Sequence, residues 1–232
     1  MKSHLIALSL LALSLTANAQ DWKKDYPVSD LTGLQADNGV DVYLTQGNTE
    51  KLTIEVKGFD ENEVRATVQN GTLMLGVNRR SGIYMNGKNR SIKAYLTVRQ
   101  LRNIQVLGGS DLIGQTPFTA NDLNVQVMGG ADLKMTLKAN QLNLQLSGGA
   151  DVDLQGSART FNAEGSGGAD LDAAGFVTET CTASAHGGAD MNVNATREIS
   201  LKAAGGSDIS YSGPAKLLSK SASGGSDITR RD

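Results

Sequence analysis

Residues 142–154 read LNLQLSGGADVDL: an alternating run, a Gly-Gly corner, an aspartate and a second alternating run. The corner motif Gly-Gly-(Ala/Ser)-Asp occurs seven times, at spacings of 21, 19, 19, 20, 18 and 19 residues. Its aspartates are Asp111, Asp132, Asp151, Asp170, Asp190, Asp208 and Asp227. A fixed period near 19 residues is the signature of a solenoid, in which each repeat forms one coil. The repeat therefore determines the fold class.

The residues that flank each corner alternate with period two, as in strands with one buried face. Positions two, four and six before the first glycine are mostly apolar, and so is the position after each aspartate. In the last repeat, three of these inward positions hold Leu218, Ala222 and Ile228. A single coil cannot bury its apolar side, so the coils must stack in register, about 4.8 Å apart. We therefore predict an all-β protein, a right-handed parallel β-helix with about 19 residues per coil.

Upstream of the repeats, residues 28–100 also alternate, with no sustained helical period. Asn70-Gly71 separates two alternating runs and favours a hairpin, because both turn positions need positive φ. We expect antiparallel strands here that cap one end of the solenoid. The predicted divisions are a signal peptide (1–19), a cap region (20–102) and the repeats (103–232), with one continuous domain over 27–230.

The first residues have the features of a secretory signal. A basic start precedes an apolar run from Leu5 to Leu15 and a small-x-small cleavage site, Ala17-Asn18-Ala19. This run is too short to span a bilayer, which needs about 20 residues. We expect an exported protein of the periplasm, the cell surface or the medium of a Gram-negative bacterium, with no transmembrane span.

Composition excludes several function classes. A formal net charge of −2 gives no general attraction for nucleic acid. Cys181 is the only cysteine, and its repeat position is apolar in other coils, which predicts a buried, unreactive thiol. His186 is the only histidine after the signal, which leaves little material for a catalytic triad. We therefore predict that the protein is not an enzyme.

Outward positions form columns of amides when the coils stack. One column holds Asn103, Asn124, Asn143 and Asn162, and another holds Gln105, Gln126 and Gln145, with Glu164 next. Amides stacked in register can hydrogen-bond along the axis, as in cross-β structures. Such ladders either stabilise the sheet alone or also dock glycan hydroxyls. An aromatic content of 4% counts against the glycan interpretation, because sugars commonly stack on aromatic rings.

The corner aspartates form a third column, in which neighbouring carboxylates repel one another. We expect each to accept backbone N–H groups within its own Gly-Gly turn. Asp153 and Asp172 follow Asp151 and Asp170 by two residues, so four carboxylates should meet on one face. This cluster either stays solvated or holds a hard divalent cation such as Ca²⁺. No other cofactor is expected.

The chain resembles the putative auto-transporter adhesin, head GIN domain family over residues 27–230. The resemblance rests on the signal peptide, on NGVDVYL at 38–44, on LRNI at 101–104 and on the repeated corners. The name-giving Gly-Ile-Asn falls on Gly39-Val40-Asp41, so this chain retains the glycine alone. The resemblance implies an exported, non-catalytic protein of the kind common in Bacteroidetes-type bacteria.

We predict an adhesin-like module that binds an envelope or extracellular glycan or protein through its amide columns and its acidic face. The first alternative is a structural envelope protein that forms homo-oligomers through the open end of the solenoid. The second alternative is a polysaccharide-processing β-helix enzyme. Sedimentation at several concentrations separates the first two, and product analysis with glycans identifies the third.

Overall fold

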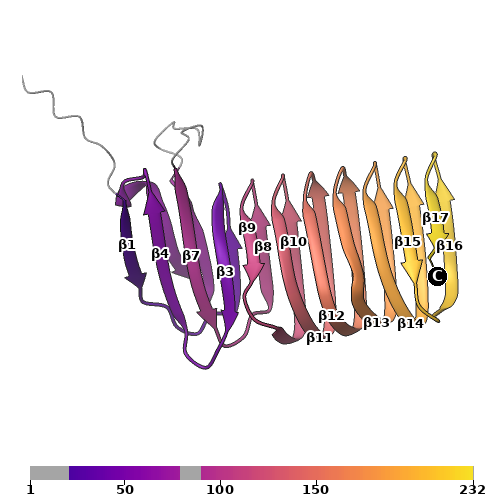
Figure 1. Cartoon of the computed structure of the whole chain (residues 1–232), viewed down its shortest axis with the longest axis horizontal. Helices are drawn as coiled ribbons and strands as arrows, with labels where there is room; N and C mark the ends of the chain where they lie inside the picture. Colours follow the sequence, from indigo (N-terminus) through magenta and orange to yellow (C-terminus); the bar gives the residue numbers. More distant parts are fainter. Residues whose placement is uncertain (1–20, 79–89, 232) are drawn as a thin grey trace, which may run out of the picture.

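The computed structural model describes residues 21–78 and 90–231, so the predicted signal peptide lies outside the described residues. The protein is an elongated solenoid of about seven turns, with strands of neighbouring turns side by side along its length (Figure 1). Apart from one short 3-10 turn, η1 (Glu61–Glu63), the regular elements of these residues are strands. The predicted all-β solenoid, its coil length and its N-terminal antiparallel strands are confirmed.

Each repeat coil has two strand segments that meet at the Gly-Gly corner and pair in parallel with the coils on either side. The strands of the central coils are β10 (Phe118–Met128), β11 (Asp132–Gly148), β12 (Asp151–Gly167), β13 (Asp170–His186) and β14 (Asp190–Ala204). The flanking coils contain β8 (Asn103–Leu107), β9 (Asp111–Gly114), β15 (Asp208–Ser212), β16 (Lys216–Ser223) and β17 (Asp227–Arg230). Asn124 pairs with Asn143 and Asp132 with Asp151, so identical positions of successive repeats lie side by side.

The stack of coils begins before the repeats, inside the region predicted as a cap. β2 (Gly33–Ala36) and β3 (Val40–Gln46) meet at the turn formed by residues 37–39 and pair in parallel with β8 and β9. β6 (Thr72–Val77) and β7 (Ser91–Val98) pair in parallel with β2 and β3 in the same way. Coils without the corner motif therefore extend the solenoid toward the N-terminus.

Antiparallel pairing, among the described residues, is confined to the N-terminal end. β1 (Trp22–Tyr26) pairs with β4 (Lys51–Lys57), β4 pairs with β7, and β5 (Val64–Gln69) pairs with β6. The predicted hairpin joins β5 to β6, with φ of 49° at Asn70 and 74° at Gly71. These strands cover the first end of the stack, opposite β16 and β17 (Figure 1).

The inward positions form a slim continuous core. The apolar residue after each aspartate is buried, from Leu112 to Ile228. Cys181 is also buried, as predicted, and burial raises the pKa of its thiol to about 12. A Cβ on Gly165 would lie 2.4 Å from Cε of Met191, so the two strand segments of a coil face each other across this core. Their outward faces lie on opposite sides of the molecule.

The last coil differs from the prediction. Leu218 is 53% exposed and leaves the inward column. Ala222 pairs with the buried Ala203, as the alignment predicted, although it is exposed at the end of the stack. The pairing of β14 with β16 shifts register after Ile199, so Leu217 takes the place that the alignment gave to Leu218. No further coil among the described residues covers β16, and every residue of this strand is exposed.

Candidate functional site

The predicted amide columns are hydrogen-bonded ladders on one outward face of the solenoid. In the first ladder, Asn124, Asn143 and Asn162 each donate an Nδ2–H to the Oδ1 of the asparagine one coil earlier, at 3.2, 2.9 and 2.9 Å. The second ladder runs the opposite way, because Gln105 donates to Gln126 (2.9 Å) and Gln126 donates to Gln145 (3.2 Å). We call this surface, made by the seven predicted amides, the amide face.

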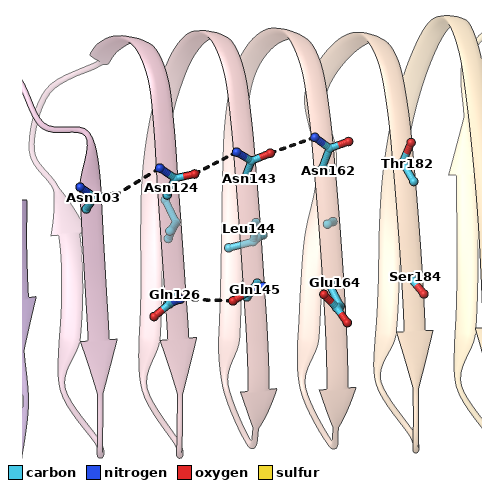
Figure 2. Close-up of a pocket in the computed structure, with 12 residues that line it drawn as sticks. Asn103, Asn124, Gln126, Asn143, Leu144, Gln145, Asn162, Glu164, Thr182 and Ser184 are labelled. Atoms are coloured by element: carbon cyan, nitrogen blue, oxygen red, sulfur yellow. Dashed lines mark hydrogen bonds between the residues drawn. The ribbon is translucent and has the colours of Figure 1, made fainter.

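A shallow groove of about 790 Å³ lies along the amide face and crosses five coils, from β8 to β13 (Figure 2). Six of the seven predicted amides line it, and Gln105 does not. A second hollow of about 680 Å³ shares Asn103 and Asn124 with the groove and extends toward Asp122. The structure therefore brings the predicted amides together in one concave strip.

Glu164, Thr182 and Ser184 complete the groove. Thr182 pairs with Asn162, and Ser184 pairs with Glu164, so both hydroxyls continue the two columns into the next coil. The columns predicted from the sequence ended at Asn162 and Glu164 and did not include these two hydroxyl residues. Their place in the nineteen-residue alignment was the signal that could have identified them.

The seven corner aspartates lie on the opposite outward face, which we call the acidic face. Two of them form hydrogen bonds that differ from the expected bonds within one turn. Asp190 Oδ1 accepts the N–H of Asp208 at 3.1 Å, and Asp208 Oδ1 accepts the N–H of Asp227 at 3.0 Å. At these two positions, stacking in register places the N–H of the next coil beside the carboxylate. Asp227, in the last coil, instead accepts from Ile228 N–H at 2.8 Å and from the Thr229 hydroxyl at 2.9 Å.

Three carboxylates of the acidic face have raised pKa values. Burial is the main cause that raises the pKa of Asp111, Asp132 and Asp170 above the usual value for an aspartate. Repulsion from carboxylates in neighbouring coils adds to each shift: Asp41 acts on Asp111, for example. The repulsion that the repeat predicted is therefore present in the folded protein.

The four carboxylates of the predicted cation cluster lie in register, with Asp151 beside Asp170 and Asp153 beside Asp172. Lys134 Nζ lies 2.6 Å from Asp153 Oδ2 and neutralises part of this charge. Among the residues that the structure describes, no group of three or more His, Cys, Asp or Glu side chains is arranged to hold a metal ion. The geometry gives the Ca²⁺ hypothesis no support, and it stays a prediction.

The segment that forms the two ladders and most of the repeated coils matches a known family. Residues 30–215 match the family model described as putative auto-transporter adhesin, head GIN domain. The chain belongs to this family. The resemblance found in the sequence is thereby confirmed. None of the curated proteins matches the chain.

Solved structures share the fold of this GIN-domain chain. A putative adhesin from Bacteroides fragilis is 22% identical, with a TM-score of 0.80 over 91% of this chain and 97% of that one. A putative lipid binding protein from Parabacteroides distasonis is 15% identical, with a TM-score of 0.69 over 94% and 98% of the two chains. In residues 21–78 and 90–231, no helix has the length and apolar character needed to cross a membrane.

Proposed function

We propose that this protein is an exported, non-enzymatic binding module that holds a glycan of the cell envelope or the extracellular space against its amide face. The observation that carries this proposal is the groove, which follows two amide ladders across five coils. Membership of an adhesin family and the predicted signal peptide both support export and a binding role.

The ladder amides have hydrogen-bonding capacity left for a ligand. A primary amide carries two N–H donors and a carbonyl oxygen with two lone pairs. Asn124 uses one N–H toward Asn103 and one lone pair toward Asn143, so a second donor and a second acceptor remain for the groove. The oxygen of Asn143 accepts from both Asn162 and Gln141, which leaves the second N–H of Asn143 for a ligand. An amide with hydrogen-bonding capacity left therefore repeats about every 4.8 Å along the axis. Sugar hydroxyls, which both donate and accept, suit such an array along an extended glycan.

A lipid fits this groove less well, although one structural neighbour is described as a putative lipid binding protein. Acyl chains are normally held in concave sites with predominantly apolar walls. Here the outward side chains along the groove are amides, hydroxyls and the Glu164 carboxylate. We therefore favour a glycan over a lipid.

The groove also lacks the usual groups for cleaving a glycan. Most glycosidases use a pair of carboxylates that flank the scissile bond. Glu164 is the one carboxylate in the lining. Ser184 Oγ lies 3.0 Å from Nε2 of His186, but no carboxylate of the described residues completes a triad with them. These features favour binding over catalysis.

A glycan array tests the proposal. The wild-type protein should bind one or more extracellular glycans. Substitution of Asn143→Ala together with Gln126→Ala should weaken that binding about tenfold, the cost of losing about 1.4 kcal/mol of hydrogen bonding. Asn192→Ala is the matched control, because Asn192 pairs with Asp172 on the opposite face. An array without a bound glycan, or an equal loss in the control, would contradict the proposal.

The open end of the solenoid favours a second candidate function, self-association in the envelope. Leu217 and Leu218 are 38% and 53% exposed on β16, whose outer backbone edge has no partner among the described residues. Unpaired strand edges are templates for pairing with another chain. Lys216 and Lys220 on the same strand oppose this pairing by charge. Sedimentation velocity over a wide concentration range would reveal such an oligomer.

A further inference from the structure

Two of the five tyrosines of the chain gather on the solenoid surface, far from the amide face. Tyr43 of β3 pairs with Tyr95 of β7 and, on its other side, with Ile113 of β9. The tyrosine rings are stacked, with centroids 5.1 Å apart and planes inclined by 16°. Tyr95 is 40% exposed and Ile113 is 36% exposed. We call these three residues the tyrosine platform.

The platform lies at the N-terminal end of the acidic face. Asp41, two residues before Tyr43, pairs with Asp111, the first aspartate of the column. Because the acidic face and the amide face are opposite sides of the coil, a ligand on the platform would not occupy the groove. No sequence pattern indicated the platform, because Tyr43 and Tyr95 belong to strands that are far apart in the chain and pair only in the fold.

Stacking between the two rings leaves ring surface for a ligand. A cross-strand aromatic pair stabilises the sheet, which accounts for the contact between the rings. It does not account for the exposure of Tyr95, whose neighbour on β4 is the small residue Thr53. An exposed aromatic ring beside a small residue is accessible to a ligand with a flat face. Aromatic rings bind such ligands through burial of apolar surface and through the electrostatic attraction of the ring quadrupole.

Hydrogen-bonding groups border the platform on one side. Glu55 Oε2 accepts the Tyr95 hydroxyl at 3.2 Å. Glu55 Oε1 accepts from Lys23 Nζ at 2.5 Å, and Lys93 Nζ lies 5.9 Å from the centre of the Tyr43 ring. The exposed Tyr95 ring beside Thr53, with carboxylate and ammonium groups close by, suits a pyranose ring, which has an apolar C–H face and hydroxyls around its rim.

We propose that the tyrosine platform is a carbohydrate subsite that binds a neutral hexose unit of a glycan, separate from the amide face. The inference extends the proposed function, since it adds a second glycan-binding surface to the module. The row of outward residues continues from Ile113 to Lys134 and Asp153. A glycan anchored on the platform and extended along the axis would pass over this ion pair, which offers further partners for hydroxyls.

Size and charge favour a sugar over other partners. A stable protein interface buries about 800 Å² on each partner, far more than three side chains provide. Nucleobases also stack on aromatic platforms, but nucleic acid needs a basic surface that follows its phosphates. Asp25, Asp41, Glu55 and Asp111 surround the platform, against Lys23, Lys51 and Lys93. This balance does not attract a polyanion.

Affinity electrophoresis in native gels tests the subsite. The gels contain laminarin, barley β-glucan or galactomannan as neutral probes, and polygalacturonate as an anionic probe. Wild-type protein should be retarded by at least one neutral probe. Tyr95→Thr, which keeps a residue suited to a strand, should weaken that binding about tenfold through loss of the stacking surface. Tyr95→Phe keeps the ring and should stay within about twofold.

Further variants separate a binding role from a structural one. Val177→Ala is the control for loss of an exposed apolar side chain, since Val177 is 42% exposed on β13, and it should bind as the wild type does. Ile113→Thr leaves both rings in place and should weaken binding about threefold by removing the apolar flank. This variant keeps the inference testable if Tyr95→Thr does not fold.

The outcomes distinguish this inference from the proposed function. Unchanged retardation of folded Tyr95→Thr, or of Ile113→Thr if Tyr95→Thr is unfolded, overturns the tyrosine subsite. Retardation by polygalacturonate alone overturns it as well. Binding that depends on Asn143 and Gln126 but not on the platform contradicts the tyrosine subsite and supports the proposed function. Binding that depends on Tyr95 alone supports the subsite and removes the amide face from glycan binding. No retardation by any probe overturns the subsite, and the glycan array then decides the proposed function.

Discussion

The two glycines of the corner at Gly148 and Gly149 have different physical roles. Gly148 has a φ of 81°, and a Cβ on it would lie 3.1 Å from the backbone nitrogen of Gly129, one coil earlier. A side chain at the first glycine would therefore push neighbouring coils apart. Gly149, the second glycine, has no atom within 4 Å of a built Cβ. At this corner the first glycine permits close stacking, whereas the second has room for a methyl group. At five other corners the second glycine has a positive φ, which favours glycine there: Gly109, Gly130, Gly188, Gly206 and Gly225.

Gly156 gives a sharp prediction at the residue scale. It has a φ of 113°, and a Cβ on it would lie 2.2 Å from the carbonyl oxygen of Leu137. Gly156→Ala should lower the free energy of unfolding by about 3 kcal/mol, because it adds both backbone strain and a clash with backbone. The melting temperature should fall by about 8 °C. Gly149→Ala is the matched control and should change it by less than about 2 °C. Equal effects of the two variants on the melting temperature would refute this account of Gly156.

At the scale of the element, the asparagine ladder should contribute stability as well as binding capacity. Asn143→Ala removes a donor to Asn124 and an acceptor for both Asn162 and Gln141. Each of these three solvent-accessible bonds contributes about 0.5 kcal/mol, so the variant should lose about 1.5 kcal/mol and about 4 °C in melting temperature. Asn192→Ala, outside the ladder, should melt close to the wild type. Identical melting of both variants would mean that the ladder is not a stabilising element.

The aspartate column should make stability depend on pH in a defined direction. The pKa of Asp132 is raised in the folded state above 3.8, so the folded protein binds more protons than the unfolded chain in the window just above that value. Stability from this group is therefore full below the window and is lost as pH rises through it. Asp132→Asn should raise the free energy of unfolding at neutral pH by about 0.3 kcal/mol, a small value because solvent screens this exposed group. The gain should vanish at about pH 3, where the wild-type group is protonated in both states. Denaturant unfolding at both pH values measures it, and a loss of stability at neutral pH would contradict the repulsion.

The sequence predicted the coils wherever the corner motif marked them and failed where another turn replaced it. Residues 37–39 form the same kind of corner between β2 and β3, with positive φ at Asn38 and Gly39. That turn contains one glycine and no following Gly-Gly pattern, so the period could not reveal it. Leu218 was misplaced because a register shift in β16 breaks the alignment. The amide columns follow from the period alone. The tyrosine platform depends on β7 lying between β3 and β4 in the sheet, although β7 comes after both strands in the sequence.

The whole molecule is asymmetric along its axis. Antiparallel strands close the N-terminal end, where β1 and β5 are the outermost strands. At the other end, β16 and β17 each pair with one earlier strand and with no later one among the described residues. Since a solenoid is stabilised by contacts between neighbouring coils, a terminal coil has about half the stabilising contacts of a central one. Opening of the fold should therefore start at the C-terminal end.

Hydrogen exchange followed by mass spectrometry tests this asymmetry. Peptides that cover residues 216–230 should exchange fastest, because every residue of β16 is exposed. Peptides from β11 to β13, which pair on both sides, should be the most protected. Uniform protection along the stack would exclude fraying from one end. A repeat at about hundredfold higher protein concentration extends the test to self-association, because pairing of two open ends would protect residues 216–230 selectively. Unchanged exchange in this segment, with monomeric sedimentation, would leave binding at the two outward faces as the function that the fold serves.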